Sequence, residues 1–301
     1  MRRLAGAIVV LWLAFGGYGA WAYATDYYQY RGFPPPRDPP GVTAGKLVQM
    51  SFRSAALGEE RSFDVYLPPG FQPGAGRRYG VMYLLHGSPG WPRLFIDVGA
   101  LGVRMDTLVH RRRIQPFIVV MPDGRDGSLI GDTEWADTAR GNYEGFVTDV
   151  VREVDGRLPT IADREHRLLA GNSAGAYAAA NIALHHLDTF SAFEAWSGYY
   201  TQTPTGVFAS ASPARLRADS PLAQAANLRA TIAKLPLAAK LYGGASDRDI
   251  GQLAPFVAAL RRAGARVTTR VLPGRHDWRL WRSQTPAMIR WAAEQFGARG
   301  A

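Results

Sequence analysis

Residues 168–180 read LLAGNSAGAYAAA: an apolar run, then Gly-x-Ser-x-Gly, then small helix-forming residues. This order predicts a strand, a sharp turn and a helix. Gly171 and Gly175 leave room for the strand and the helix to pass close together, where side chains would collide. The turn lifts the hydroxyl of Ser173 clear of the sheet edge, and the first N–H groups of the new helix offer positive potential to a developing oxyanion. Ser173 is therefore a candidate nucleophile if the rest of the chain supplies its partners, although an incidental serine in a glycine-tight turn would read the same way.

The remaining pattern predicts an α/β fold with a mostly parallel central sheet and helices on both faces. Strand patterns cover residues 46–53, 61–67, 81–85, 117–121, 166–170, 193–197, 237–242 and 267–272. Helix patterns cover residues 99–112, 143–158, 174–187, 255–263 and 281–296. Strands that alternate with helices imply parallel neighbours joined by helical crossovers. At 301 residues, the chain is long enough for one such domain.

The first 45 residues divide into two segments that precede the expected catalytic domain over residues 46–297. Residues 1–24 begin with a short basic stretch and then run from Leu4 to Ala24 without a charge. Such a segment is typical of a transmembrane anchor, and the small-x-small pattern at residues 22–24 equally suits a cleaved signal peptide. Residues 25–45 form a proline-rich linker, in which residues 33–41 are too rich in proline for a helix and favour a stiff extended spacer. Either interpretation predicts an extracytoplasmic domain, membrane-anchored or secreted.

Composition narrows the function classes. The formal charge of +10 arises almost entirely from arginine, and no stretch interleaves basic and aromatic residues, so a nucleic-acid partner is not expected. The chain has no cysteine, which excludes disulfides, thiol nucleophiles and thiolate metal sites. We expect neither a metal nor an organic cofactor.

A serine hydroxyl needs a base within hydrogen-bond reach, and the base needs an orienting carboxylate. Five of the six histidines lie far down the elbow helix, in arginine-rich settings or beside a loop glycine: His86, His110, His166, His185 and His186. His276 remains, in a loop directly after the last predicted strand. In a parallel sheet this loop opens on the same carboxyl edge as the elbow.

The carboxylate is expected between the serine and the histidine, also after a strand. The loop at residues 243–249 offers Asp247, our choice, and Asp249, the alternative. Either could instead cap a helix that starts near Ile250. For the oxyanion hole, the backbone N–H of Ala174 is expected to join that of Ser88, in the loop after the third strand, although this loop could be a simple turn.

The joint order of these pieces resembles the α/β-hydrolase superfamily, and within it the esterase family that includes S-formylglutathione hydrolases, feruloyl esterases and secreted mycolyltransferases. The matching pieces are LLHG at 84–87, VVMPDG at 119–124, the elbow, GASD at 244–247, PGRHDW at 273–278 and Trp281. The resemblance spans about residues 46–296. Two departures leave the substrate open: Ala174-Gly175-Ala176 replaces Met-Gly-Gly, and Arg275 replaces the glycine before the histidine.

The leading hypothesis is an extracytoplasmic serine carboxylesterase that works through an acyl-enzyme intermediate. One alternative is a mycolyltransferase-like enzyme that moves an acyl group to an envelope sugar or alcohol. Another is a non-catalytic envelope-binding protein on a hydrolase scaffold. The expected partners are an ester, such as a lipid or envelope-glycan ester, and the membrane if the first segment is retained. Aromatic residues in the loops are candidates for the apolar lining of the substrate pocket: Trp91, Phe95, Trp135, Tyr199 and Tyr200.

Overall fold

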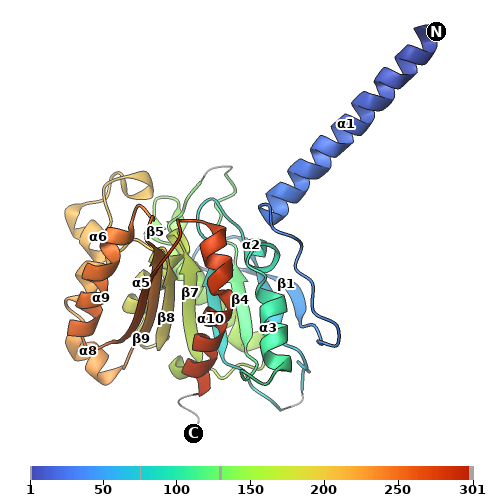
Figure 1. Ribbon diagram of the computed structural model, residues 1–301. Helices are drawn as coiled ribbons and strands as arrows, with labels where there is room; N and C mark the ends of the chain where they lie inside the picture. The colour runs from blue at the N-terminus through green and yellow to red at the C-terminus, as the bar shows by residue number, and fades with distance from the viewer. Residues whose placement is uncertain (1, 75, 129–130, 298–301) are drawn as a thin grey trace.

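The computed structural model contains one mixed sheet with the strand order β1-β2-β4-β3-β7-β8-β9-β10 (Figure 1). It describes residues 2–74, 76–128 and 131–297, and it describes the side chains from residue 12 onward. The strands are β1 (Lys46–Arg53), β2 (Glu60–Leu67), β3 (Val81–Leu85), β4 (Ile118–Pro122), β7 (Arg167–Asn172), β8 (Ala192–Trp196), β9 (Ala238–Gly244) and β10 (Arg266–Leu272). A small separate hairpin pairs β5 (Asp137–Thr138) with β6 (Gly141–Asn142).

The sheet is antiparallel at one edge and parallel elsewhere. β1 pairs with β2, and β2 with β4, in antiparallel register, whereas the pairs from β4 through β10 are parallel. β3 and β4 are apolar along their whole length and fully buried, as expected for strands covered on both faces. In β10, at the other edge, exposed and half-buried residues alternate.

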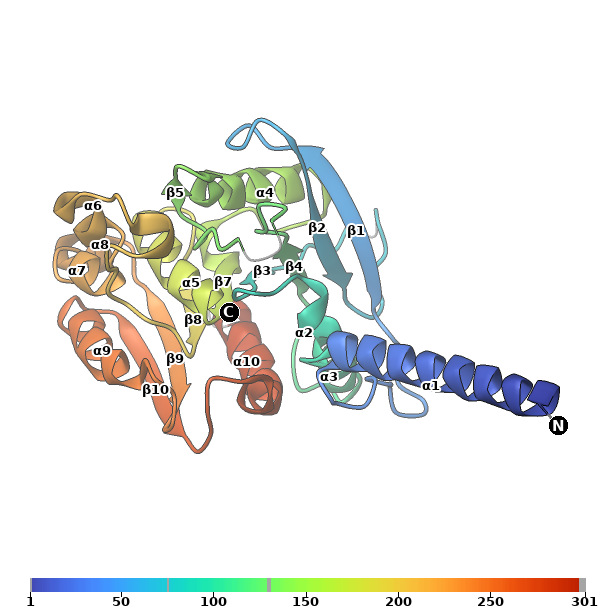
Figure 2. The same ribbon diagram turned by 90° about the horizontal axis from the view of Figure 1, so that it is seen from above.

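Helices cover both faces of this sheet, as the view in Figure 2 shows. One apolar core lies beneath α4 (Tyr143–Arg157), α5 (Ala174–His185) and α9 (Leu253–Arg262). The other lies beneath α2 (Arg93–Asp97), α3 (Leu101–His110) and α10 (Trp278–Gly297). Three short helices follow β8, namely α6 (Pro213–Ala218), α7 (Pro221–Ala225) and α8 (Arg229–Lys234). The sequence-based prediction of an α/β-hydrolase fold with a mostly parallel sheet is therefore confirmed.

Most predicted elements lie within a few residues of their observed bounds. The difference that bears on the site is the start of the closing helix. We expected it to begin near residue 281, but α10 begins at Trp278. Asp277 Oδ1 accepts hydrogen bonds from the backbone N–H groups of Arg279 and Leu280, which satisfies the first turn and fixes this start. As a result, α10 begins two residues after His276.

The N-terminal segment forms helix α1 (Arg2–Tyr30), which projects from the body of the molecule (Figure 1). The predicted membrane segment Leu4–Ala24 lies within it, and the side chains of residues 4–11 fall outside the described part of the structure. Among the described residues, no helix has the length and apolar character needed to cross a membrane. The transmembrane part of the prediction thus gains no support from the structure.

Candidate active site

The elbow after β7 holds Ser173 in an uncommon backbone conformation, with φ 56° and ψ −123°. A Cβ on Gly171 would lie 2.3 Å from the carbonyl oxygen of Gly175, and one on Gly175 would lie 1.9 Å from that of Leu85. Both positions therefore require glycine. A strained backbone of this kind costs about 1–3 kcal/mol and persists where its surroundings enforce it. Here the Ser173 N–H donates to the Trp196 carbonyl at 3.0 Å.

Three residues from the ends of different strands form one hydrogen-bonded line. His276 Nδ1 lies 2.9 Å from Asp247 Oδ2, and His276 Nε2 lies 2.8 Å from Ser173 Oγ. The carboxylate makes Nδ1 the protonated nitrogen, which leaves Nε2 to accept the serine hydroxyl proton. The Asp247 side chain is 2% exposed and that of His276 is 24% exposed, so the acid is shielded while the base is accessible. This arrangement can activate the hydroxyl of Ser173.

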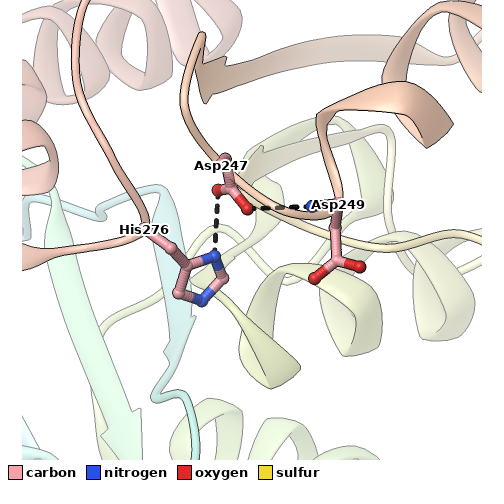
Figure 3. Close-up of side chains that lie close together, drawn as sticks. All are labelled: Asp247, Asp249 and His276. Atoms are coloured by element: carbon pink, nitrogen blue, oxygen red, sulfur yellow. Dashed lines mark hydrogen bonds and ion pairs between the residues drawn. The ribbon is translucent and has the colours of Figure 1, made fainter.

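Asp249, the alternative carboxylate, does not reach the histidine in this line (Figure 3). Its backbone N–H donates to Asp247 Oδ1 at 3.1 Å, and its carboxylate accepts from Arg248 Nε at 3.2 Å. Asp249 makes no side-chain capping bond to the turn that follows it. The structure therefore places Asp247 against His276 and uses the backbone of Asp249 to hold Asp247.

The two predicted oxyanion donors lie beside the serine. Ala174 opens α5, and Ser88 lines the same cavity as Ser173. The Gly87 N–H donates to Asn172 Oδ1 at 3.2 Å, which ties the loop after β3 to the elbow. Neither the Ser88 nor the Ala174 amide meets an acceptor within the described part of the chain. Both N–H groups are therefore free to stabilise a developing negative charge.

Trp281 supports the histidine from the side, a role that sequence reasoning missed. The rings of His276 and Trp281 meet edge to face, with centroids 5.2 Å apart. Trp281 Nε1 donates to Ser197 Oγ at 3.1 Å, and this buried hydrogen bond fixes the indole. The sequence places Trp281 at the start of a helix, but it offers no signal that Ser197, after β8, would be its partner.

Comparison with known proteins adds family membership to this geometry. The model of the family described as "Putative esterase" matches residues 54–292. The chain belongs to this esterase family. An endo-1,4-beta-xylanase/feruloyl esterase of Xylanibacter ruminicola is 30% identical over 184 residues, which is 58% of this chain and 23% of that protein. An esterase of Mycobacterium tuberculosis is 28% identical over 154 residues, 51% of this chain and 32% of that protein. This chain thus matches only a minor part of each of these longer relatives.

Solved structures resemble this chain over most of its length. A ferulic acid esterase superposes with a TM-score of 0.75 at 26% identity, covering 84% of this chain and 99% of the other. An S-formylglutathione hydrolase from Staphylococcus aureus superposes with a TM-score of 0.68 at 16% identity, covering 83% and 100%. The second likeness concerns the fold alone.

His86, at the same sheet edge, has a different environment. Its Nδ1 lies 3.0 Å from the Gly87 carbonyl oxygen, and the Gly124 N–H donates to its Nε2 at 3.1 Å. The Asp123 carboxylate lies 3.8 Å from His86 Nε2. Burial alone would raise the pKa of Asp123, but the hydrogen bonds from Arg125, together with the nearby His86 ring, hold this pKa below its usual range. His86 therefore links two loops of the protein, in agreement with the sequence interpretation that it suits loop structure.

The acidic groups beside His276 also form a set of potential metal ligands. One donor atom each from Asp247, Asp249 and His276 lies within 4.8 Å of the others. An ion bound there would compete with the hydrogen bond between Nδ1 and Asp247 Oδ2. A metal site and the hydrogen-bonded line are thus alternative uses of these atoms.

The Ser173 cavity has a volume of about 600 Å³. Its walls come from the loop after β3, the elbow, the start of α10 and the end of α1. The α1 side contributes Tyr27, Arg31, Gly32 and Phe33, and the α10 side contributes Asp277, Trp278, Arg279 and Trp281. The contribution from α1 was not expected from the sequence.

A second cavity, of about 450 Å³, lies across the loop at residues 86–90. Two of the five aromatic candidates for pocket lining, Trp91 and Trp135, line it. Phe95 and Tyr200 are instead buried in the cores, and Tyr199 stacks on Tyr177 with centroids 5.3 Å apart. Phe95 packs within the protein because it lies on the buried face of α2, and Tyr199 and Tyr200 do so because they follow β8 directly, beneath covering helices.

Proposed function

We propose that this protein is a serine carboxylesterase that hydrolyses its substrate through an acyl-enzyme on Ser173. The observation that carries the proposal is the hydrogen-bonded line from Asp247 through His276 to Ser173. It ends at a strained elbow beside two amides without acceptors in the described part of the chain. Membership of the esterase family and the esterase names of its relatives support an ester as the substrate.

In the first half of the reaction, Ser173 Oγ attacks the ester carbonyl carbon and its proton passes to His276 Nε2. Asp247 stabilises the imidazolium that forms. The carbonyl oxygen gains a negative charge, which the N–H groups of Ser88 and Ala174 stabilise. When the tetrahedral intermediate collapses, the bond to the leaving oxygen breaks. His276 donates its proton to this oxygen, the alcohol departs and the acyl group remains on Ser173.

The second half repeats these steps with water. His276 Nε2 takes a proton from water as the water oxygen attacks the acyl carbon. The same two amides hold the second oxyanion. Collapse releases the carboxylic acid, and the proton on His276 returns to Ser173 Oγ. No other group has to supply electrons or protons.

The test uses a serine-reactive phosphonate and p-nitrophenyl esters of increasing acyl length. We expect the full chain to react with the phosphonate and to hydrolyse at least one ester of the series. Ser173→Ala should lose both properties while its circular-dichroism spectrum stays unchanged. A folded chain that neither reacts nor hydrolyses would instead support a non-catalytic binding protein, and hydrolysis retained by Ser173→Ala would exclude Ser173 as the nucleophile.

We further propose that the esterase acts outside the cytoplasm. The basic start, the uncharged stretch at residues 4–24 and the proline-rich linker support this location. The described part of α1 also exposes large apolar side chains, among them Trp12 and Phe15 at 76% and 75%. Cell fractionation of the full-length chain tests the proposal. Recovery in the membrane or the medium is expected, and recovery from the cytosol with an intact N-terminus would contradict it.

A further inference from the structure

The end of α1 and the residues that follow it form one wall of the Ser173 cavity. Tyr27, Arg31 and Phe33 line this cavity together with Ser173 and His276. These residues precede the family match, which begins at residue 54. The wall therefore lies outside the region that the family model matches, and its chemistry bears on the substrate of this particular protein.

Aromatic contacts hold the wall in place. The Tyr28 and Trp91 rings stack with centroids 4.9 Å apart, and the Arg31 guanidinium lies over both rings, 5.2 and 5.5 Å from their centroids. Two residues on, the Arg282 guanidinium lies over the Phe33 ring at 4.8 Å. Stacking of this kind orients a guanidinium without neutralising its charge.

Arg31 is a cation without a counterion in the described part of the chain. It takes part in none of the ion pairs there, and its Nε is buried without a hydrogen-bond partner. Arg167 Nε is buried without a hydrogen-bond partner too, but the Arg167 guanidinium has a counterion in Asp155, and Arg164 has one in Glu165. A buried donor left unpaired is costly, so an unpaired guanidinium that is also held in position suggests a ligand.

The charge around the cavity agrees with this view. Arg279 is a second, exposed cation in the lining. Asp277 is the single carboxylate among the lining residues given by the structure, and its Oδ1 is occupied by the first turn of α10. The wall near the reacting serine is thus positively charged and free to accept an anion.

We propose that the cavity selects esters that carry an anionic group, and that Arg31 binds this group. The proposal rests on the proposed esterase function and adds to it the chemical class of the substrate. A carboxylate is the simplest group that fits, because a guanidinium can donate two parallel hydrogen bonds to it. The anionic group lies on the acyl or the alcohol part of the ester, and the experiment distinguishes these two cases.

The experiment compares esters that differ only in charge. For the acyl part, the pair is mono-p-nitrophenyl succinate and its methyl ester. For the alcohol part, the pair is the acetate ester of 4-hydroxybenzoate and that of methyl 4-hydroxybenzoate. The ratio of kcat/KM for the anionic over the neutral ester is measured for the full chain and for Arg31→Gln, Arg31→Lys and Arg37→Gln. Because each ratio is compared between variants, differences in intrinsic reactivity cancel.

For one of the two pairs, we expect Arg31→Gln to lower this ratio by about tenfold, the loss of one partly exposed charge-assisted interaction. Arg31→Lys should restore much of the ratio, and added salt should lower it in the parent chain. Arg37 lies in the same linker and does not line the cavity, so Arg37→Gln should leave the ratio unchanged. The affected pair identifies the part of the ester that bears the charge.

Unchanged ratios for both pairs in Arg31→Gln would overturn the proposal. An equal loss on the charged and neutral esters would also overturn it, because it would assign Arg31 a purely structural role. The parent chain could hydrolyse the neutral esters while the ratio responds neither to Arg31→Gln nor to added salt. In that case the esterase function stands and the anionic substrate class fails. If the parent chain hydrolyses no ester at all, the proposed function fails first.

Discussion

Two histidines at the same edge of the sheet, His86 and His276, are used in opposite ways. Each lies near an aspartate, Asp123 and Asp247 respectively. Both ring nitrogens of His86 contact backbone groups, and its side chain is only 7% exposed. His276 contacts a carboxylate with one nitrogen and the serine hydroxyl with the other, and its side chain is 24% exposed.

The difference shows what makes a histidine a candidate base in this fold. Proximity to a carboxylate is shared by both, so it does not decide. The decisive feature is that one ring nitrogen faces a group able to react, in a place that a substrate can enter. His86 has no such nitrogen, because Gly124 and Gly87 occupy both of its own.

The largest effect should follow from His276→Ala. Loss of the base in a serine triad lowers kcat by a factor on the order of 10⁶. Steady-state hydrolysis of a p-nitrophenyl ester measures this loss, and denaturant unfolding should show little change because His276 lies at the surface of the cavity. If His276→Ala kept most of the activity, His276 would not be the base, and the contrast drawn with His86 would be wrong.

The second effect concerns the carboxylate. Asp247→Asn should lower kcat by a factor on the order of 10³ to 10⁴, because the imidazole loses the partner that fixes its tautomer. Asp249→Asn is the matched control, since only its backbone N–H contacts Asp247. Its kcat should stay close to that of the parent chain. The reverse order of effects would transfer the orienting role to Asp249.

His86→Ala tests the structural side of the comparison. The substitution leaves the Gly124 N–H without its buried acceptor, a loss of about 1–3 kcal/mol in the free energy of unfolding. Denaturant unfolding measures this value, and the folded variant should still react with the phosphonate at Ser173. A variant that kept its stability and lost its reactivity would show that His86 takes part in the chemistry.

The last effect concerns the pH dependence of stability and involves Glu134. Its neighbour Trp135 donates a hydrogen bond through its indole N–H to the His86 carbonyl. Burial, together with the charge of Asp132, raises the pKa of Glu134 from 4.5 to about 8, although the hydrogen bond from the Tyr199 hydroxyl opposes this rise. A folded-state pKa above the unfolded value means that the protonated acid stabilises the fold. This contribution is complete below pH 4.5 and is lost as the pH rises through 8.

The free energy of unfolding should therefore fall between these two pH values, and Glu134→Gln should flatten the fall. Unfolding curves at pH values from below 4.5 to above 8 measure it. An identical pH dependence in the parent chain and the variant would show that Glu134 is not the group responsible.

The sequence predicted the candidate catalytic residues that lie in loops directly after strands. The elbow, the loop with Asp247 and the loop with His276 each follow an apolar run directly, so the sheet itself brings these residues together. The preference for Asp247 over Asp249 agrees with the observed contacts. The fold class followed from the same alternation of strands and helices.

Other parts of the site depend on contacts that no local pattern encodes. Arg31 and Phe33 reach the cavity because they stack on Trp91 and beneath Arg282, far away in the chain. The support of His276 by Trp281 depends on Ser197, after a different strand. The short helices after β8 have too few turns to produce a clear period. Such features follow from tertiary packing, which a single sequence does not reveal.

The most direct test of the account is to map the phosphonate adduct by peptide mass spectrometry on the full chain. We predict one adduct per chain on the peptide that contains Ser173, formed in parallel with the loss of ester hydrolysis. The rate of labelling should fall sharply in His276→Ala and Asp247→Asn and should change little in Asp249→Asn. An adduct on another residue, or complete inhibition with Ser173 unmodified, would contradict the assignment of Ser173 as the nucleophile.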